Sequence, residues 1–128
     1  MKYYINKTIT AEFDKAIEFV TEALKKEGFG VLSEIDIQQK LNEKLDVDFR
    51  KYKILGACNP PNAYKALQHE DKIGTMLPCN VIVQEIGENQ VEVAAVDPAA
   101  SMMAVGNKEL AGIAGEIKAK LERVIASL

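Results

Sequence analysis

The stretch MLPCNVIVQEIGENQVEVAAV, residues 76–96, predicts the β-hairpin around which the rest of the fold is arranged. Its arms, 76–86 and 90–96, are rich in the β-branched and apolar residues typical of strands. The turn Gly87-Glu88-Asn89 supplies residue types that tolerate a positive φ, and Asp97-Pro98 stops the second arm.

Both faces of the first arm carry apolar side chains, namely Val81, Ile82, Val83 and Ile86. A sheet that is polar on neither face needs cover on both. We therefore expect one face to carry helices and the chain to form a homodimer.

Two amphipathic helices flank this hairpin in the sequence. The first is expected between Thr10, as its cap, and Gly28, and its apolar residues recur at three- and four-residue steps: Phe13, Ala16, Ile17, Val20, Ala23 and Leu24. The second follows Asn107, also read as a cap, with the stripe Leu110, Ile113, Ala114, Ile117, Leu121, Val124, Ile125 and Leu128. Gly112 and Gly115 are interpreted as positions of close helix packing.

The remaining pattern adds strands at 2–9, 29–35 and 49–57. Short helices are expected at 37–45 and 60–68, the second with Ala63, Tyr64 and Leu67 facing inward. Long helices at both ends with meandering strands between them are typical of the α+β class. We predict a single domain, residues 1–128, with a mainly antiparallel sheet, two long helices packed on one face, and short helices in the connections.

Composition and charge exclude several classes of function. Of the 128 residues, 48% are hydrophobic and 27% charged, which are ordinary globular values. The net charge of −3 argues against a general nucleic-acid binder, which needs a concentrated positive field. With no signal peptide and no apolar stretch long enough for a membrane span, we expect a cytoplasmic protein without nucleic-acid or membrane partners.

The segment Leu55-Gly56-Ala57-Cys58-Asn59-Pro60-Pro61 places one of the two cysteines just before a predicted helix. Asn59 is a good helix cap, and Pro60 suits the first helical position, where a missing N–H costs nothing. The positive end of the helix dipole favours an anion, so a thiolate at Cys58 would be stabilised there.

The second cysteine opens the segment Cys79-Asn80-Val81, directly after Pro78. A strand end, a short helix and a return strand could bring Cys58 and Cys79 together, with Asn59 and Asn80 adding amide groups. In a cytosolic chain the two are expected to be thiols rather than a disulfide. Free cysteine is also among the most buried residue types, so inert packing is an equal reading of both.

Metal and cysteine–histidine chemistry have weaker support. Zinc prefers four ligands, or three and a water, and the spacing of Cys58 and Cys79 matches no compact zinc motif. These two cysteines are nevertheless the candidate ligands for a soft metal. His69, the only histidine, would lie at the far end of the helix that follows Cys58, so a Cys–His pair is not expected.

Three segments resemble the family named domain of unknown function 302: residues 28–32, residues 52–60 and Leu77-Pro78-Cys79-Asn80-Val81. Val96-Asp97-Pro98 and Met102-Met103 are similar to the same pattern. The resemblance implies a bacterial or archaeal α+β domain, similar to TATA-binding-protein-like folds and commonly homodimeric. It transfers no catalytic role. It marks only these positions as a suspected site: Cys58, Asn59, Pro60, Pro78, Cys79, Asn80, Asp97 and Pro98.

Three functional hypotheses follow. The first is a site that binds a small molecule or a soft metal, formed by Cys58, Asn59, Cys79, Asn80 and Asp97. The second is a thiol-dependent enzyme, redox or nucleophilic, with Cys58 and Cys79 as candidate catalytic residues. The third is a structural, dimeric interaction module in which both cysteines are packed. The identity of a ligand, substrate or cofactor is not specified by the residues.

Overall fold

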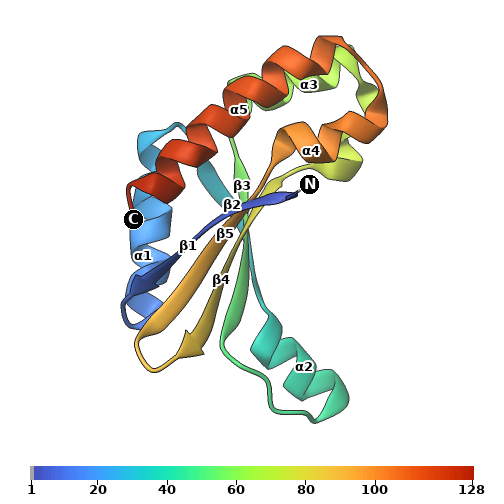
Figure 1. Ribbon diagram of the computed structural model, residues 1–128. Helices are drawn as coiled ribbons and strands as arrows, with labels where there is room; N and C mark the ends of the chain where they lie inside the picture. The colour runs from blue at the N-terminus through green and yellow to red at the C-terminus, as the bar shows by residue number, and fades with distance from the viewer. Residues whose placement is uncertain (1) are drawn as a thin grey trace.

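A computed structural model describes residues 2–128, and its strands form one five-stranded antiparallel sheet (Figure 1). The strands are β1 (Tyr4–Thr10), β2 (Gly30–Asp36), β3 (Tyr52–Cys58), β4 (Cys79–Gly87) and β5 (Gln90–Val96). Their order is β1-β5-β4-β3-β2, so β2 to β5 follow one another as a meander and β1 adds to the free side of β5. The edge strand β2 carries a register shift between Val31 and Ser33 where it pairs with β3.

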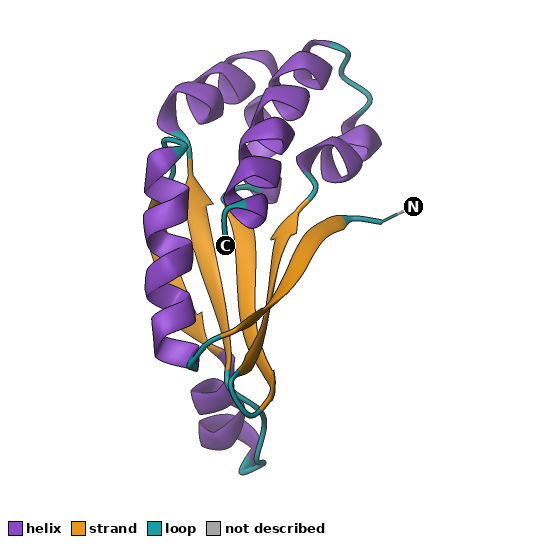
Figure 2. Ribbon diagram, turned by 60° about the vertical axis from the view of Figure 1, so that its left-hand side comes forward, coloured by secondary structure: helices purple, strands orange, loops and turns teal. Residues whose placement is uncertain are grey.

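Five α-helices and two short 3₁₀ segments join these strands. They are α1 (Phe13–Lys26), α2 (Ile37–Leu45), α3 (Pro60–His69), η1 (Asp71–Met76), α4 (Pro98–Met102), η2 (Met103–Val105) and α5 (Glu109–Ala126). The long helices α1 and α5 cover the same face of the sheet (Figure 2). Helices α3 and α4 lie beside α5 at one end of the sheet, whereas α2 lies at the opposite end and buries no residue.

The core lies between the sheet and the two long helices. Strand alternation sends every second residue of the central strands into it, and these are fully buried: Leu55, Val81, Val83, Val91, Val93 and Ala95. The helices supply the facing stripe, which includes Val20, Leu24, Leu110, Ile117, Leu121 and Val124. The α+β class, the antiparallel sheet and the packing of two long helices on one face are therefore confirmed.

Several local expectations are wrong for identifiable reasons. Helix α1 begins after Glu12 rather than Thr10, because Thr10 still pairs with Gln90 in the sheet. Strand β4 begins at Cys79, since residues 71–76 form the 3₁₀ segment. Asn107 precedes the helix without being its cap: its Oδ1 accepts from the Glu109 N–H, and α5 starts after Lys108. Helix α4, just after Asp97, was not expected.

Helix α3 faces its neighbours with a different side from the one predicted. Asn62 and Ala66 are buried, while Tyr64 is 66% exposed and Leu67 is 44% exposed. The buried residues are small because α3 lies close to α5. None of the helices described between residues 2 and 128 combines the length and apolar character needed to cross a membrane.

The glycines of α5 face open space rather than a packed neighbour, contrary to expectation. A Cβ added at Gly112 or Gly115 would meet no atom within 4 Å. Replacing an exposed helical glycine with alanine removes a backbone-entropy cost without a steric one.

We therefore expect Gly112→Ala and Gly115→Ala each to raise the free energy of unfolding by about 0.5–1 kcal/mol. The matched control is Gly28→Ala, which should lower it because Gly28 has a φ of +84°. Urea denaturation followed by circular dichroism measures all three. Destabilisation by the α5 substitutions would contradict the open environment of these glycines.

Candidate functional site

The largely apolar hollow beside Cys58 and Cys79 is the candidate site. It has a volume of about 320 Å³ and lies between the end of the sheet, α3, η1 and α5. Its lining is Phe29, Leu32, Ala57, Cys58, Asn59, Ala63, Ala66, Leu67, Gly74, Leu77, Pro78, Cys79 and Ile117. The only side-chain polar groups in this set are the Asn59 amide and the two thiols, so the hollow offers little to a strongly polar ligand.

The local structure at Cys58 follows from its sequence as predicted. Strand β3 ends at Cys58, Asn59 is the N-cap of α3, and Pro60 and Pro61 occupy its first positions. Cys58 is half-buried, so its sulfur is partly accessible at the wall of the hollow.

Asn59 holds three elements together and has little capacity left for a ligand. Its Oδ1 accepts from the backbone N–H of Asn62 at 3.4 Å and from Asn62 Nδ2 at 3.2 Å. Its Nδ2 donates to the carbonyl of Glu27 at 3.3 Å, just beyond the end of α1. Gly28 makes this approach feasible, because a Cβ at that position would lie 3.1 Å from Asn59 Nδ2. Asn59 therefore has a structural role: it joins the start of α3 to the end of α1 and forms part of the lining of the site.

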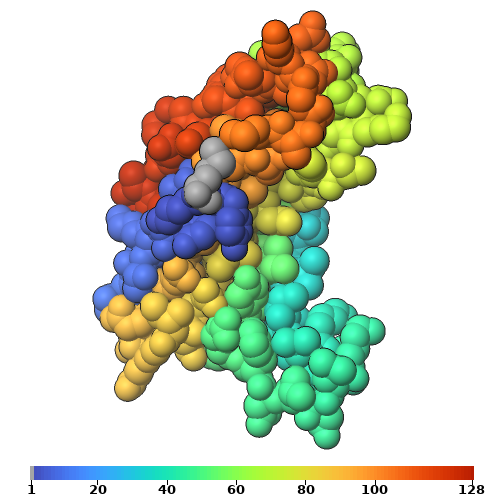
Figure 3. Space-filling view, turned by 45° about the vertical axis from the view of Figure 1, so that its right-hand side comes forward, coloured from blue at the N-terminus to red at the C-terminus, as the bar shows by residue number. Residues whose placement is uncertain are grey.

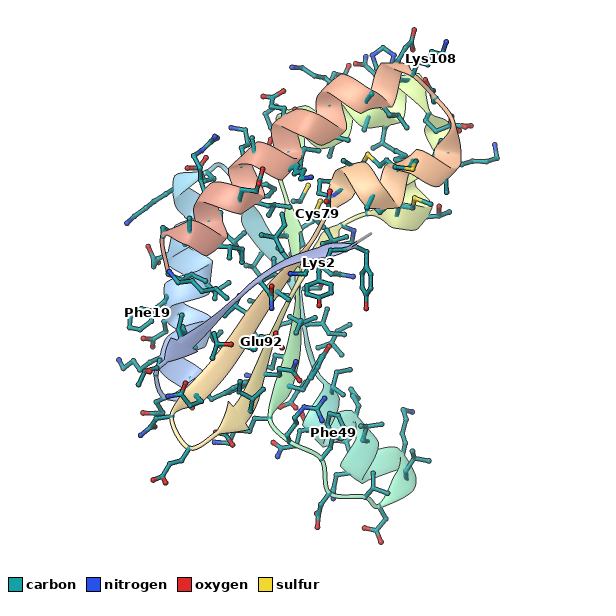
Figure 4. All side chains as sticks on the ribbon, in the orientation of Figure 1. Lys2, Phe19, Phe49, Cys79, Glu92 and Lys108 are labelled. Carbon is teal, nitrogen blue, oxygen red and sulfur yellow. The ribbon has the colours of Figure 1, made fainter. Side chains whose placement is uncertain are left out.

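Cys79 is brought next to Cys58 by the register of two neighbouring strands. Ala57 of β3 pairs with Cys79 of β4, so Cys58, the next residue of β3, lies one position beyond the partner of Cys79. Cys79 is 6% exposed and lies at the end of the sheet near α4 and α5 (Figure 4). Burial raises the pKa of the Cys79 thiol to about 11, and the charge of a nearby Cys58 thiolate adds to the rise. Cys79 is thus protonated at neutral pH.

Asn80 and Asp97, expected at the same site, lie outside the hollow. Because side chains alternate along β4, Asn80 projects from the opposite face of the sheet, next to a second hollow lined by tyrosines. Asp97 caps α4: its Oδ1 accepts from the N–H groups of Ala99 and Ala100, and its Oδ2 lies 3.1 Å from Lys118 Nζ. The structure therefore brings together Cys58, Asn59, Pro78 and Cys79 only.

The apolar residues that complete the hollow were not identified from the sequence. Phe29, Leu77 and Ile117 come from three separate segments, and only the fold shows that they meet. Leu32 carried a usable signal. By strand period it shares one side with Gly30 and Glu34, and in the structure it lies at the register shift of β2 and is 70% exposed. One exposed apolar side chain is not informative by itself, but Leu32 lines the hollow together with the exposed Leu67, and the two form an apolar rim.

No metal cluster accompanies the two cysteines. Within residues 2–128, no group of three or more His, Cys, Asp or Glu side chains is placed to hold a metal ion. His69 lies away from Cys58, at the far end of α3, with its Nδ1 2.7 Å from Glu109 Oε2.

Comparison with known proteins gives a family but no activity. The sequence profile of Domain of unknown function DUF302 matches residues 5–128. The crystal structure of an uncharacterized conserved protein DUF302 from Bacillus stearothermophilus is similar, with a TM-score of 0.90, 28% sequence identity and 98% of each chain covered. No curated protein matches the chain.

The difference in exposure between the cysteines predicts selective alkylation. Iodoacetamide at pH 8 should add one group per folded chain, at Cys58, and a second only after unfolding in guanidinium, because Cys79 is buried and protonated. Intact-mass spectrometry measures the additions. Cys58→Ser should abolish the first addition and Cys79→Ser should preserve it. Equal rates at both cysteines in the folded protein would contradict the geometry.

The raised pKa of Cys79 also predicts a loss of stability in alkali. Its ordinary value is 9.0 and its folded value is about 11, so the unfolded chain releases this proton first. The contribution is fully present below pH 9 and is lost as the pH rises through 11. The loss should be on the order of 2 kcal/mol, and it should be smaller in Cys79→Ala. Urea unfolding between pH 8 and 11 measures this loss. The prediction is refuted if the free energy of unfolding falls with pH equally steeply in the parent protein and in Cys79→Ala.

Proposed function

Because the chain belongs to the family Domain of unknown function DUF302, whose name assigns no activity, we propose its function from the site: it binds a small, predominantly apolar molecule in the hollow beside Cys58 and Cys79. The observation that carries the proposal is the hollow itself. Small-molecule sites are typically concave, mostly apolar and at least about 300 Å³ in volume. This one has about 320 Å³ and a largely apolar lining from six elements, β2, β3, α3, η1, β4 and α5.

The exposed side chains at its rim support an apolar ligand. Leu32 of β2 and Leu67 of α3 line the hollow and remain 70% and 44% exposed, respectively. Each would bury further apolar surface when a ligand occupies the space between them, and this burial favours binding. Asn59 already accepts from Asn62 and donates to the Glu27 carbonyl, which leaves at most one N–H for a ligand, too few groups to select sugars or nucleotides.

The state of Cys79 favours a small molecule over a metal ion or thiol catalysis. A soft metal would have only two sulfur ligands here, and one of them would have to lose a proton that burial retains. A resolving or nucleophilic thiol faces the same cost, since the thiolate is the reactive form. In the proposed role, Cys79 is part of the wall and Cys58 is a soft, partly exposed contact for the ligand.

Indole is a suitable probe because it is rigid, mostly apolar and small. Added to ¹⁵N-labelled protein, it should shift the amide resonances of Cys58, Cys79 and Leu67. Ala63→Phe places a ring in the hollow from its half-buried wall and should abolish these shifts. Gln68→Phe, which adds the same ring on the exposed side of α3, should leave them unchanged.

Thermal unfolding of both variants is the control for folding, and each should show a cooperative transition. Leu67→Gln, at the exposed rim, should weaken indole binding several-fold without affecting the core. Shifts that persist in Ala63→Phe, or that map to another surface, would reject this hollow as the binding site.

A further inference from the structure

The face of the sheet opposite α1 and α5 carries a second hollow, separate from the cysteines. In the space-filling view the strands lie in a recess between the helices at one end and α2 at the other (Figure 3). The hollow there has a volume of about 380 Å³. Its lining is Tyr3, Tyr4, Tyr52, Asn80, Ile82, Gln84, Glu92, Ala94, Ala95 and Val96. We name it the tyrosine hollow.

Strand register explains how this hollow forms. Ile82 of β4 pairs with Ala94 of β5, and the small alanine leaves space in the middle of the face. Tyr52 stands beside Gln84 on one side, and Tyr4 stands beside Val96 on the other. The floor is therefore aliphatic and the walls are aromatic, with rings contributed by the strands on both sides of the β4–β5 pair.

One charged side chain lines the tyrosine hollow, and neutral groups hold it in place. Glu92 Oε1 accepts from Gln84 Nε2 at 2.7 Å, and Glu92 Oε2 accepts from Asn6 Nδ2 at 2.9 Å. Among the ion pairs of residues 2–128, none involves Glu92. Its negative charge is thus fixed in orientation and uncompensated by a direct cationic partner, at the edge of an aromatic-walled space.

Two protein cations already lie against the surrounding rings. Lys2 Nζ is 5.1 Å from the centre of the Tyr4 ring and donates to Asn6 Oδ1 at 3.4 Å. The Arg50 guanidinium lies 4.3 Å from the Phe49 ring and 5.8 Å from the Tyr52 ring, and its Nε donates to Gln84 Oε1 at 2.7 Å. Lys2 is exposed and lies outside any helix or strand, so a competing cation can displace its side chain. Arg50 is held by its hydrogen bond and stacking.

We propose that the tyrosine hollow binds a small organic cation, a protonated or quaternary amine. Its hydrocarbon part would pack on Ile82, Ala94 and Val96. Its charge would lie against the tyrosine rings and Glu92, where cation–π attraction and charge complementarity act together. The ammonium group of Lys2 is an intramolecular substitute for this ligand at Tyr4. This site is independent of the hollow beside Cys58 and Cys79.

Phenyltrimethylammonium chloride is the probe, at constant ionic strength and with the full chain. Its methyl proton resonance should move upfield on binding, because of the ring currents of the tyrosines. Benzyl alcohol, the neutral comparison, should bind more weakly, and benzoate most weakly. Strongest binding of benzoate would overturn the proposal, since it would assign the site to Arg50 and Lys2.

Two substitutions should act in opposite directions. Glu92→Gln removes the negative charge and should raise the Kd by about five- to tenfold, whereas Lys2→Gln removes the competing cation and should lower it by about two- to threefold. Glu88→Gln, in the exposed hairpin turn, is the matched control and should leave the Kd unchanged. Equal affinity in the Glu92→Gln protein and the parent would refute the proposal.

Lys2 lies outside the helices and strands, so the effect of Lys2→Gln on the Kd is interpretable even if Glu92→Gln is poorly folded.

The competing occupant of this face is a second copy of the chain, consistent with the homodimer expected from the sequence. Sedimentation velocity at the concentration of the binding measurement distinguishes a monomer with a free tyrosine hollow from a dimer that covers it. A dimer that leaves the probe unbound would overturn the proposal, and a monomer that binds it, with the two opposite effects, would support it.

Discussion

The alternation of side chains along β4 governs both faces of this molecule. Cys79, Val81 and Val83 point to the helices, and Asn80, Ile82 and Gln84 point away from them. A shift of one residue in the pairing of β4 would exchange the whole set, so the core fixes the register. The same constraint separates two neighbours in the sequence. Cys79 borders one hollow, and Asn80 borders the other on the far side of the sheet.

This separation explains how far sequence reasoning could go. The Asn59-Pro60 helix start and the general architecture depend on local chemistry and hydrophobic period, and these were predicted. The sequence allowed the two cysteine segments to come close but did not require it, because their proximity depends on the pairing of β3 with β4. Asn80 was grouped with Cys79 because adjacency in sequence was taken for adjacency in space. Asp97 was grouped with them through the family pattern, although its carboxylate caps α4 and forms an ion pair with Lys118.

The rest depends on tertiary packing that a single sequence does not contain. Helix α3 was given the wrong inward face, because Tyr64 and Leu67 are larger and more apolar than the residues that are buried. Close packing on α5 selects the small Ala66 instead, and Asn59 secures the start of the helix. The tyrosine hollow arises from side chains on β1, β3, β4 and β5, so no local motif marks it.

The irregularity in β2 has a consequence for how this sheet meets other molecules. An edge strand exposes unpaired N–H and C=O groups to strand addition by another chain. The shift between Val31 and Ser33 interrupts the regular spacing of those groups, and the charged Glu34 and Asp36 follow directly. A strand from another chain could therefore not form a regular ladder of hydrogen bonds with β2, and fibre-like growth of the sheet from this edge is disfavoured. On the β2 side, recognition is therefore left to the faces of the sheet rather than to its edge.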